Sequence, residues 1–387
     1  EFRRVLFRSY HKIIILLVIN LKKKLNSMIR LFEPYSNKEE LCSIRDVLKS
    51  NFWASGAGVN KVKAFEETFT KYVKSKYTVA VNSGTAALHL AVSTLDVANT
   101  EILVPSMSFV STAHAAVYNN AKPVFVDIDE KTLCIDIDDM ERKISKKTSV
   151  VIPVHFGGYP CNMKKLHDIT TNHDIHVVED AAHACGATLD GKRIGSHSEL
   201  VCFSFHPVKN LSMPTGGAIS INANQDVKSI LTSLRWCGIT NRNDSYYDVD
   251  KVGFNYYMNE ISAAIGLIQL RRLNQMNTIR RNIAKQYHKL INIEYKMPLS
   301  TDCSYHLYWI RVKKRDEFMK KMKENGIETG IHYKPIHTMT LYKTSQKLRV
   351  ADRIWKELVS IPIHLNLSQK DIDKIISCVN TYATSTG

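Results

Sequence analysis

The sequence of 387 residues lacks a closely spaced cysteine pair, an internal repeat and a low-complexity linker. Its eight cysteines are scattered, and no two of them have the Cys-x-x-Cys spacing that structural zinc sites use. We therefore predict no metal site, and we interpret the cysteines as reduced, buried apolar residues of a cytoplasmic protein. Basic clusters interleaved with aromatic residues are also absent, which argues against nucleic acid as a partner.

Long apolar runs are missing as well. Residues 13–19 form an apolar run between basic flanks, but they are too few to span a bilayer, and no small-residue cleavage site follows Lys24. We interpret residues 1–27 as a vector-derived or leader tail and predict no membrane partner, with a membrane or secretory role as the alternative. This tail carries +6 of the formal net charge of +16 and leaves +10 on residues 28–387. That balance suits an anionic substrate, although a merely basic protein would show it too.

Two apolar strands lead into polar residues that can carry chemistry. Residues 176–180 are rich in β-branched side chains and end at Asp180, and residues 201–205 run into a loop that contains Lys209. Open α/β sheets bind ligands at the carboxyl ends of their strands. Asp180 could instead cap the next helix, and Lys209 could be one of 53 basic side chains on a wet surface.

A third element precedes these two in the chain. Residues 77–81 have the pattern of a short strand, and Ser83, Gly84 and Thr85 form a small-residue turn before an apolar helix. Free backbone N–H groups at the start of such a helix, with hydroxyls beside them, suit a phosphate ester. An ordinary helix cap is the alternative, because the turn alone is a weak signal.

Together the three elements predict a site for pyridoxal phosphate. In such a site a lysine bonds covalently to the cofactor's aldehyde, and a carboxylate keeps the pyridine nitrogen protonated so that the ring withdraws electrons. Lys209 and Asp180 are the candidates for these two catalytic roles. Strands alternate with helices throughout this region, which predicts an α/β fold with a mainly parallel sheet covered on both faces.

Four blocks of the sequence resemble the successive motifs of the DegT/DnrJ-type nucleotide-sugar aminotransferases. They are residues 83–88 (SGTAAL), 179–184 (EDAAHA), 203–210 (FSFHPVKN) and 253–266 (GFNYYMNEISAAIG). The resemblance extends from residue 28 to the carboxyl terminus. One departure follows the lysine, where the family commonly has Gly-Glu-Gly-Gly and this chain has Pro-Thr-Gly-Gly at residues 214–217. The missing carboxylate and the stiffer loop alter the usual contacts there, while the lysine itself is retained.

The resemblance implies the fold-type-I architecture of pyridoxal phosphate enzymes. We expect a large three-layer cofactor-binding domain over residues 28–270, followed by a long connecting helix and a small α+β domain over residues 271–387. The resemblance also implies a homodimer with active sites at the subunit interface. In that dimer, Asn255 of one subunit is expected to reach the phosphate of the cofactor bound to the other.

The remaining site residues follow from the same resemblance. Phe109 is expected to stack on the pyridine ring, with a core phenylalanine as the alternative, and His183 to lie near the ring or its phenolate oxygen. Backbone and hydroxyl groups of the turn and of the strand before the lysine are expected to hold the phosphate. The cofactor-binding candidates are thus Gly84, Thr85, Phe109, Asp180, His183, Ser204, Lys209 and Asn255.

The implied reaction is a transamination between two substrates. An amino acid, expected to be glutamate, donates its amino group, and a nucleotide-linked keto-sugar receives it. A sugar dehydratase of the same fold is one alternative, although such enzymes replace the lysine, commonly by His. A catalytically silent ligand-binding regulator is the other. Substrate choice is expected to depend on Trp53, Arg235 and the loop 332–337, although a surface position is the preferred interpretation of Arg235 and simple packing is an equal alternative for Trp53.

Overall fold

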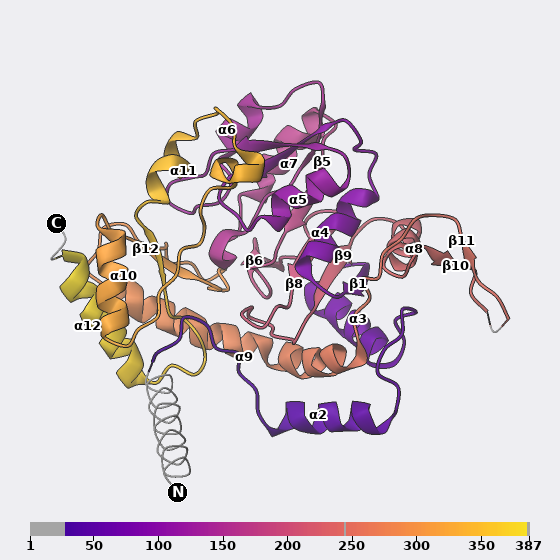
Figure 1. Cartoon of the computed structure of the whole chain (residues 1–387), viewed down its shortest axis with the longest axis horizontal. Coiled ribbons are helices and arrows are strands. Elements are labelled where there is room, and N and C mark those ends of the chain that lie inside the picture. Colours follow the sequence, from indigo (N-terminus) through magenta and orange to yellow (C-terminus); the bar gives the residue numbers. More distant parts are fainter. Residues whose placement is uncertain (1–27, 244, 385–387) are drawn as a thin grey trace, which may run out of the picture.

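The computed structural model describes residues 28–243 and 245–384 of the chain (Figure 1). The helices are α2 (Lys38–Lys49), α3 (Asn60–Val73), α4 (Gly84–Ser93), α5 (Ser111–Tyr118), α6 (Ile137–Arg142), α7 (Met163–Asn172), α8 (Gln225–Leu234), α9 (Glu260–Leu290), α10 (Arg315–Glu324), α11 (Arg349–Ile354) and α12 (Gln369–Thr384). The short 3-10 helices are η1 (Phe156–Gly158), η2 (Ile336–Thr338) and η3 (Thr340–Tyr342). The strands are β1 (Tyr77–Val81), β2 (Glu101–Pro105), β3 (Lys122–Val126), β4 (Thr148–Val151), β5 (His176–Asp180), β6 (Thr188–Leu189), β7 (Lys192–Arg193), β8 (Leu200–Ser204), β9 (Gly217–Ile221), β10 (Ile239–Thr240), β11 (Asp248–Val249), β12 (Tyr308–Arg311) and β13 (Leu358–Ile361).

One seven-stranded sheet forms the centre of the molecule, with the strand order β1-β9-β8-β5-β4-β2-β3. Strand β9 runs antiparallel to both of its neighbours, β1 and β8. The other pairings are parallel. The six remaining strands therefore point the same way, and their carboxyl ends share one edge of the sheet. This is the edge at which a ligand site is expected.

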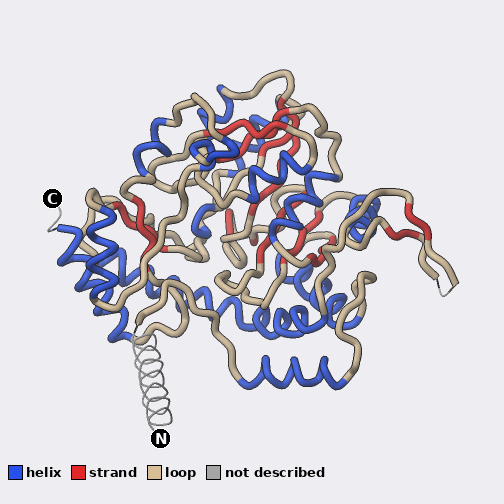
Figure 2. Tube along the Cα trace, in the orientation of Figure 1, coloured by secondary structure: helices blue, strands red, loops and turns tan. Residues whose placement is uncertain are grey.

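Apolar side chains alternate between the two faces of the strands and bury a separate core on each side. On one face, Ala80, Val201 and Phe203 pack with apolar residues of α3 and α9. On the other face, Val79 and Cys202 pack with residues of α4, α5 and α7. Figure 2 shows the strands enclosed between these helices. The mainly parallel, helix-covered sheet expected from the sequence is therefore present.

The long helix α9 leads from the sheet toward the carboxyl-terminal part of the chain. It begins after Asn259, whose Oδ1 accepts a hydrogen bond from the backbone N–H of Ser262 at 2.8 Å. Helices α2 and α3 pack against it, and it runs along the lower part of Figure 1 toward α10 and α12. There β12 and β13 form a two-stranded antiparallel sheet. The sequence of residues 305–312 predicts an alternating strand, but β12 is buried on both faces.

The cysteines need a partial correction. All eight are free, and five are buried as expected, but Cys42 and Cys237 are exposed and Cys378 is half-buried. Cys42 is exposed because α2 buries only Glu40 and Val47 of its twelve residues. The interpretation of residues 1–27 lies outside the described residues. Within the described ranges, no helix combines the length and the apolar character needed to cross a membrane.

Candidate active site

The carboxyl ends of the parallel strands border a cavity of about 410 Å³. Its walls come from the loops after β1, β2, β5 and β8 and from the segment before η2. Seven of the eight predicted cofactor-binding residues line it, although they come from four separate parts of the sequence. These residues are Gly84, Thr85, Phe109, Asp180, His183, Ser204 and Lys209.

The start of α4 forms one end of the cavity. Oγ of Ser83 accepts a hydrogen bond from the backbone N–H of Ala86 at 3.1 Å and caps the helix. A Cβ atom on Gly84 would lie only 2.7 Å from Cβ of Ser204, so this position must be glycine for β8 to approach the helix start. Oγ1 of Thr85, in the first turn of α4, lies 2.6 Å from Oγ of Ser111. First-turn N–H groups together with hydroxyls make an anion site that suits a phosphate.

The departure from the family motif at residues 214–217 lies next to this helix start. Thr215 lines the cavity, and its hydroxyl donates a hydrogen bond to the carbonyl of Asn82. A Cβ atom on Gly217 would lie 2.4 Å from the carbonyl carbon of Ser83. Gly217 therefore keeps β9 close to the helix start, and Thr215 supplies a polar contact from the altered half of the motif.

Lys209 and Asp180 face the same cavity. Asp180 is 4% exposed at the end of β5. Burial raises the pKa of its carboxyl, while hydrogen bonds from the Thr112 hydroxyl at 2.8 Å and the Ala182 N–H at 3.1 Å lower it. Burial also lowers the pKa of the Lys209 amine to about 8, and the charge of Asp180 opposes this effect. A carboxylate and an amine with these properties can hold a cation and transfer a proton, respectively.

His183 has a defined orientation in the cavity wall. Its Nδ1 accepts a hydrogen bond from the N–H of Gly157 at 3.2 Å, so Nε2 carries the proton and donates to the hydroxyl of Tyr333 at 3.0 Å. The two rings are nearly parallel, with an interplanar angle of 16°. Burial, followed by the nearby charge of Lys209, lowers the pKa of His183 well below its usual value. His183 is therefore neutral near physiological pH.

Sequence reasoning missed two residues beside Lys209. His306 is 1% exposed, and its Nε2 lies 3.4 Å from Nζ of Lys209. The ring of Phe32, which lines the cavity, stacks on His306 with the centroids 5.5 Å apart. Neither residue belongs to a motif, and both come from segments far from Lys209 in the sequence. A lone histidine in an apolar strand pattern carries no signal of its own.

Phe109 and Asn255 differ in their relation to the cavity. Phe109 is 56% exposed and lines the cavity, so it is not a core phenylalanine. Its ring centroid lies 6.2 Å from that of Tyr333. Asn255 does not line the cavity and is exposed. Its backbone carbonyl accepts a hydrogen bond from Nδ2 of Asn82, at the cavity edge, at 3.3 Å.

Of the candidates for substrate selection, the loop 332–337 contributes His332 and Tyr333 to the cavity. Trp53 is 53% exposed outside it. The expectation for Arg235 was wrong, because this residue is neither on the surface nor in the cavity. It is 2% exposed, pairs with Glu66 and donates to the carbonyl of Ala80 at 2.8 Å. A buried guanidinium with a carboxylate partner and a backbone acceptor ties α8 to α3 and β1.

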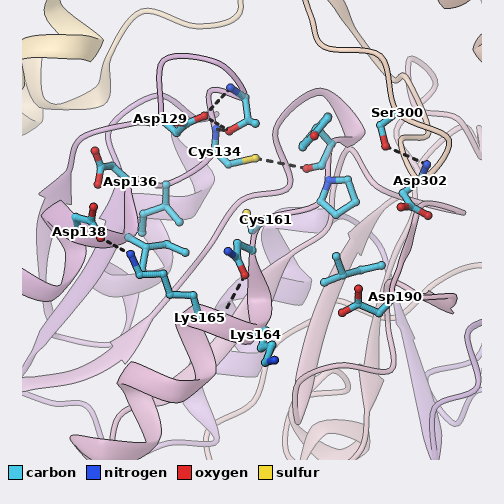
Figure 3. A pocket seen from close by; sticks show the side chains of 17 residues that line it. Asp129, Cys134, Asp136, Asp138, Cys161, Lys164, Lys165, Asp190, Ser300 and Asp302 are labelled. Carbon is cyan, nitrogen blue, oxygen red and sulfur yellow. Dashed lines mark hydrogen bonds and ion pairs between the residues drawn. The ribbon is translucent and has the colours of Figure 1, made fainter.

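A larger cavity of about 610 Å³ contains none of the predicted site residues (Figure 3). Several aspartates line it, but three of them already have hydrogen-bond or ion-pair partners. Asp136 caps α6 through the N–H of Asp139, Asp129 binds the N–H and hydroxyl of Thr132, and Asp138 pairs with Lys165. Among the described residues, no group of three or more His, Cys, Asp or Glu side chains could hold a metal ion. The smaller cavity is therefore the candidate active site.

Comparisons with known proteins match nearly the whole chain. Residues 34–380 match the sequence model of the DegT/DnrJ/EryC1/StrS aminotransferase family. The spore coat polysaccharide biosynthesis protein SpsC of Bacillus subtilis is 33% identical over 90% of this chain and 96% of its own.

Two solved structures extend this likeness to the fold. The putative sugar aminotransferase Spr1654 of Streptococcus pneumoniae, solved in apo, PMP and PLP forms, superimposes in its apo form with a TM-score of 0.87 at 28% identity, over 92% of this chain and 98% of its own. PseC of Helicobacter pylori, an aminotransferase involved in pseudoaminic acid biosynthesis, reaches a TM-score of 0.88 at 25% identity, over 92% of this chain and 100% of its own. These likenesses confirm the predicted fold class.

Proposed function

Because this chain belongs to the DegT/DnrJ/EryC1/StrS aminotransferase family and is a pyridoxal phosphate-dependent sugar aminotransferase of fold type I, we propose that it transfers an amino group from glutamate to a nucleotide-linked keto-sugar. The observation that carries this proposal is the shared cavity of Lys209, Asp180 and the start of α4. These three parts are what such a cofactor requires, and none of them lines the cavities around Asp129, His167 or His89.

The residues of the cavity fit the cofactor. The space that a Cβ atom on Gly84 would fill against Ser204 lies where the helix start can receive a phosphate. Asp180 is buried, and a cationic ring nitrogen held against it would offset the burial that raises its pKa. Gly84, Thr85 and Ser204 would hold the phosphate, and Lys209 would carry the covalent bond. Phe109 would cover one face of the ring, because its exposed side chain lines the cavity.

The side chains of the cavity then have separate roles in proton transfer, water exclusion and charge stabilisation. When bound, pyridoxal phosphate supplies an aldehyde that bonds to amines and a ring that withdraws electrons. Lys209 accepts and returns a proton at Nζ, which its lowered pKa of about 8 permits near neutral pH. Neutral His183 donates from Nε2 to the hydroxyl of Tyr333, and the rings of Tyr333 and Phe109 in the cavity wall would limit the access of water. Asp180 keeps its negative charge available to a cation.

Two observations support the nucleotide-linked sugar and the glutamate donor. Residues 28–387 carry a net charge of +10, which attracts a diphosphate and an acidic amino acid alike. The names of SpsC and PseC connect relatives of this chain with polysaccharide and pseudoaminic acid biosynthesis. The free cysteines support a reducing, cytoplasmic location, where nucleotide-linked sugars would be available.

A second copy of the chain completes this proposal. The hairpin of β10 and β11 extends away from the body of the molecule in Figure 1. It and the segment after it expose large apolar side chains, namely Tyr246, Tyr247, Val249 and Val252. An extended apolar hairpin of this kind gains stability when it packs on a partner. We propose a homodimer in which Asn255 of one subunit contacts the cofactor phosphate of the other.

Borohydride reduction of the cofactor-loaded protein followed by peptide mapping tests the site. The cofactor is expected on Lys209, and Lys209→Ala should remove both the label and the visible absorbance. A separate, unreduced sample of the cofactor-loaded protein is incubated with a panel of amino acids and of nucleotide-linked 3-keto and 4-keto sugars. Glutamate should bleach the visible absorbance and a keto-sugar should restore it. Label on another lysine would refute the site, whereas a correctly labelled protein that ignores every nucleotide-linked sugar would refute the substrate.

A further inference from the structure

His306 is buried between two rings at the side of Lys209. Its ring centroid lies 5.5 Å from that of Phe32, nearly parallel, and 4.6 Å from that of His183. Its backbone N–H donates to the carbonyl of Gly157 at 2.9 Å, and the N–H of the same glycine donates to His183. Gly157 has φ 64°, a conformation that favours glycine. One glycine therefore fixes the backbone of His306 and the ring of His183 together.

The two ring nitrogens of His306 have different surroundings. Nε2 lies 3.4 Å from Nζ of Lys209. Nδ1 is buried and has no hydrogen-bond partner among residues 28–243 and 245–384. Lys209 lines the cavity but His306 does not, so His306 contacts the lysine from outside the cavity lining. The contact joins the reacting amine to a group that a substrate does not touch.

This asymmetry selects one tautomer of the ring. Burial, followed by the charge of Lys209, lowers the pKa of His306 well below its usual value, so the ring is neutral and carries a single proton. A proton on Nδ1 would leave a buried N–H without an acceptor, which is rarer in proteins than an under-used acceptor. A proton on Nε2 points at Lys209 instead. A donor in that place can bond only to the lone pair of an uncharged amine, the form of Lys209 that prevails above its pKa of about 8.

From this geometry we propose that neutral His306, protonated at Nε2, is a positioning residue that donates a hydrogen bond to the uncharged amine of Lys209. The inference rests on the proposed role of Lys209 and adds the group that orients it. By bonding to the lone pair, His306 favours the uncharged amine over the ammonium. It also fixes the direction in which Nζ points when the lysine is not bonded to the cofactor.

Other charged and titratable groups around this pair also shift the pKa values of Lys209 and His306. Asp180 raises the pKa of Lys209, and burial outweighs it. The charge of Lys209 lowers the pKa values of the neighbouring histidines, and Arg280 adds to this effect at His306. The groups that face the pair are Asp180, His183, His206, His332 and Arg280.

Two substitutions distinguish a hydrogen-bond donor at position 306 from a ring that only fills space. His306→Phe keeps a ring between Phe32 and His183 but has no N–H, and His306→Gln can place its amide N–H near the position of Nε2. In the full chain freed of cofactor, the pH dependence of acetic anhydride labelling at Lys209, read by peptide mass mapping, reports the pKa of its amine. His306→Phe should move this titration upward by roughly half to one pH unit, the equivalent of one typical hydrogen bond. His306→Gln should stay close to the wild type.

An unchanged or lowered titration in His306→Phe, or equal behaviour of the two variants, would overturn the proposal. Circular dichroism and cofactor uptake check that each variant is folded. If His306→Phe does not fold, the wild-type chain with ¹⁵N-labelled histidine gives the answer, because the nitrogen shifts distinguish the two neutral tautomers. A His306 signal of the Nδ1–H form would exclude the donor. Borohydride label away from Lys209 would instead refute the proposed function, and an unmoved titration at a correctly labelled Lys209 refutes only this inference.

Discussion

Oγ1 of Thr112 lies 2.8 Å from Oδ2 of Asp180 and donates a hydrogen bond to it inside the protein. Thr112 is fully buried in the first turn of α5, so no water replaces its hydroxyl. Thr112→Val keeps the shape of the side chain and leaves the carboxylate with one donor fewer. We expect pyridoxal phosphate to bind roughly 10- to 100-fold more weakly, as for the loss of a hydrogen bond to a charged group. Titration of the cofactor-free protein with pyridoxal phosphate measures this affinity. Thr112→Ser, which retains the hydroxyl, should bind the cofactor nearly normally.

A neutral side chain at Asp180 should separate binding from turnover. Asp180→Asn cannot keep a ring nitrogen protonated, so we expect Lys209 to be labelled as before while kcat falls by about 100- to 1,000-fold, the scale of losing one preorganised electrostatic partner. Asp190→Asn is the matched control, since Asp190 is exposed and lines the larger cavity. Near-normal turnover in Asp180→Asn would reduce Asp180 to a structural role.

The lowered pKa values of the histidines around Lys209 should make the cofactor-free protein sensitive to acid. Burial, followed by the charge of Lys209, lowers the pKa of His332 to about 4 from 6.5. The unfolded chain therefore takes up a proton at higher pH than the folded chain, and stability is lost as pH falls from 6.5 toward 4. For His332 alone this amounts to about 2 kcal/mol at pH 5.

Urea unfolding at pH 7 and pH 5 measures that loss. His332→Gln should reduce the difference in unfolding free energy between the two pH values by about this amount. His173→Gln, at the exposed end of α7, removes a histidine from solvent and should leave the difference unchanged. Equal acid sensitivity in His332→Gln and the wild type would show that His332 titrates normally.

The subunit proposal makes cofactor affinity depend on association. If Asn255 contacts the phosphate of the neighbouring subunit, dimerisation and cofactor binding must strengthen each other by the same factor. Asn255→Ala should weaken binding by roughly 0.5–1.5 kcal/mol, or up to about 3 kcal/mol against a charged acceptor. Sedimentation at the wavelength of the bound cofactor follows occupancy during dilution, with Asn172→Ala as an exposed control. A monomer that retains its cofactor fully would refute the shared site.

The close approach of Gly84 and Ser204 should appear as a coupling between the two positions. Gly84→Ala places a Cβ atom 2.7 Å from that of Ser204 and should cost about 1–3 kcal/mol through overpacking, with weaker cofactor binding. Ser204→Gly removes the opposing atom, so the double variant should recover part of that stability in thermal unfolding. Strictly additive losses would mean that the chain relieves the contact by moving elsewhere.

Much of this site was predictable because its parts are local in sequence. Strand ends and helix starts place Asp180, Lys209 and Gly84 at one edge of any mainly parallel sheet. Each of these residues lies within a few positions of the strand or helix pattern that identifies it. The order of the sequence motifs pointed to the other candidate site residues. The α/β class followed from the alternation of strand and helix patterns in the same way.

The missed features depend on contacts between distant segments. His306 meets Lys209 across 97 residues, and Arg235 meets Glu66 across 169. No periodicity of a single segment contains such a pairing. Arg235 was placed on the surface because a charged side chain is usually exposed, and only its partners in α3 and β1 make burial tolerable.

The pairing of β1 with β9 has a consequence for how the protein is made. β1 leads directly into the helix start that we propose receives the phosphate, yet among the described strands it pairs only with β9, which lies about 140 residues later. A nascent chain that ends before Gly217 leaves this strand without a neighbour on either side. The strand that is synthesised first in the sheet must therefore wait for the strand that is synthesised last. We therefore expect cofactor capture to be a late event of folding, and a chain interrupted before Ile221 should emerge unable to hold pyridoxal phosphate.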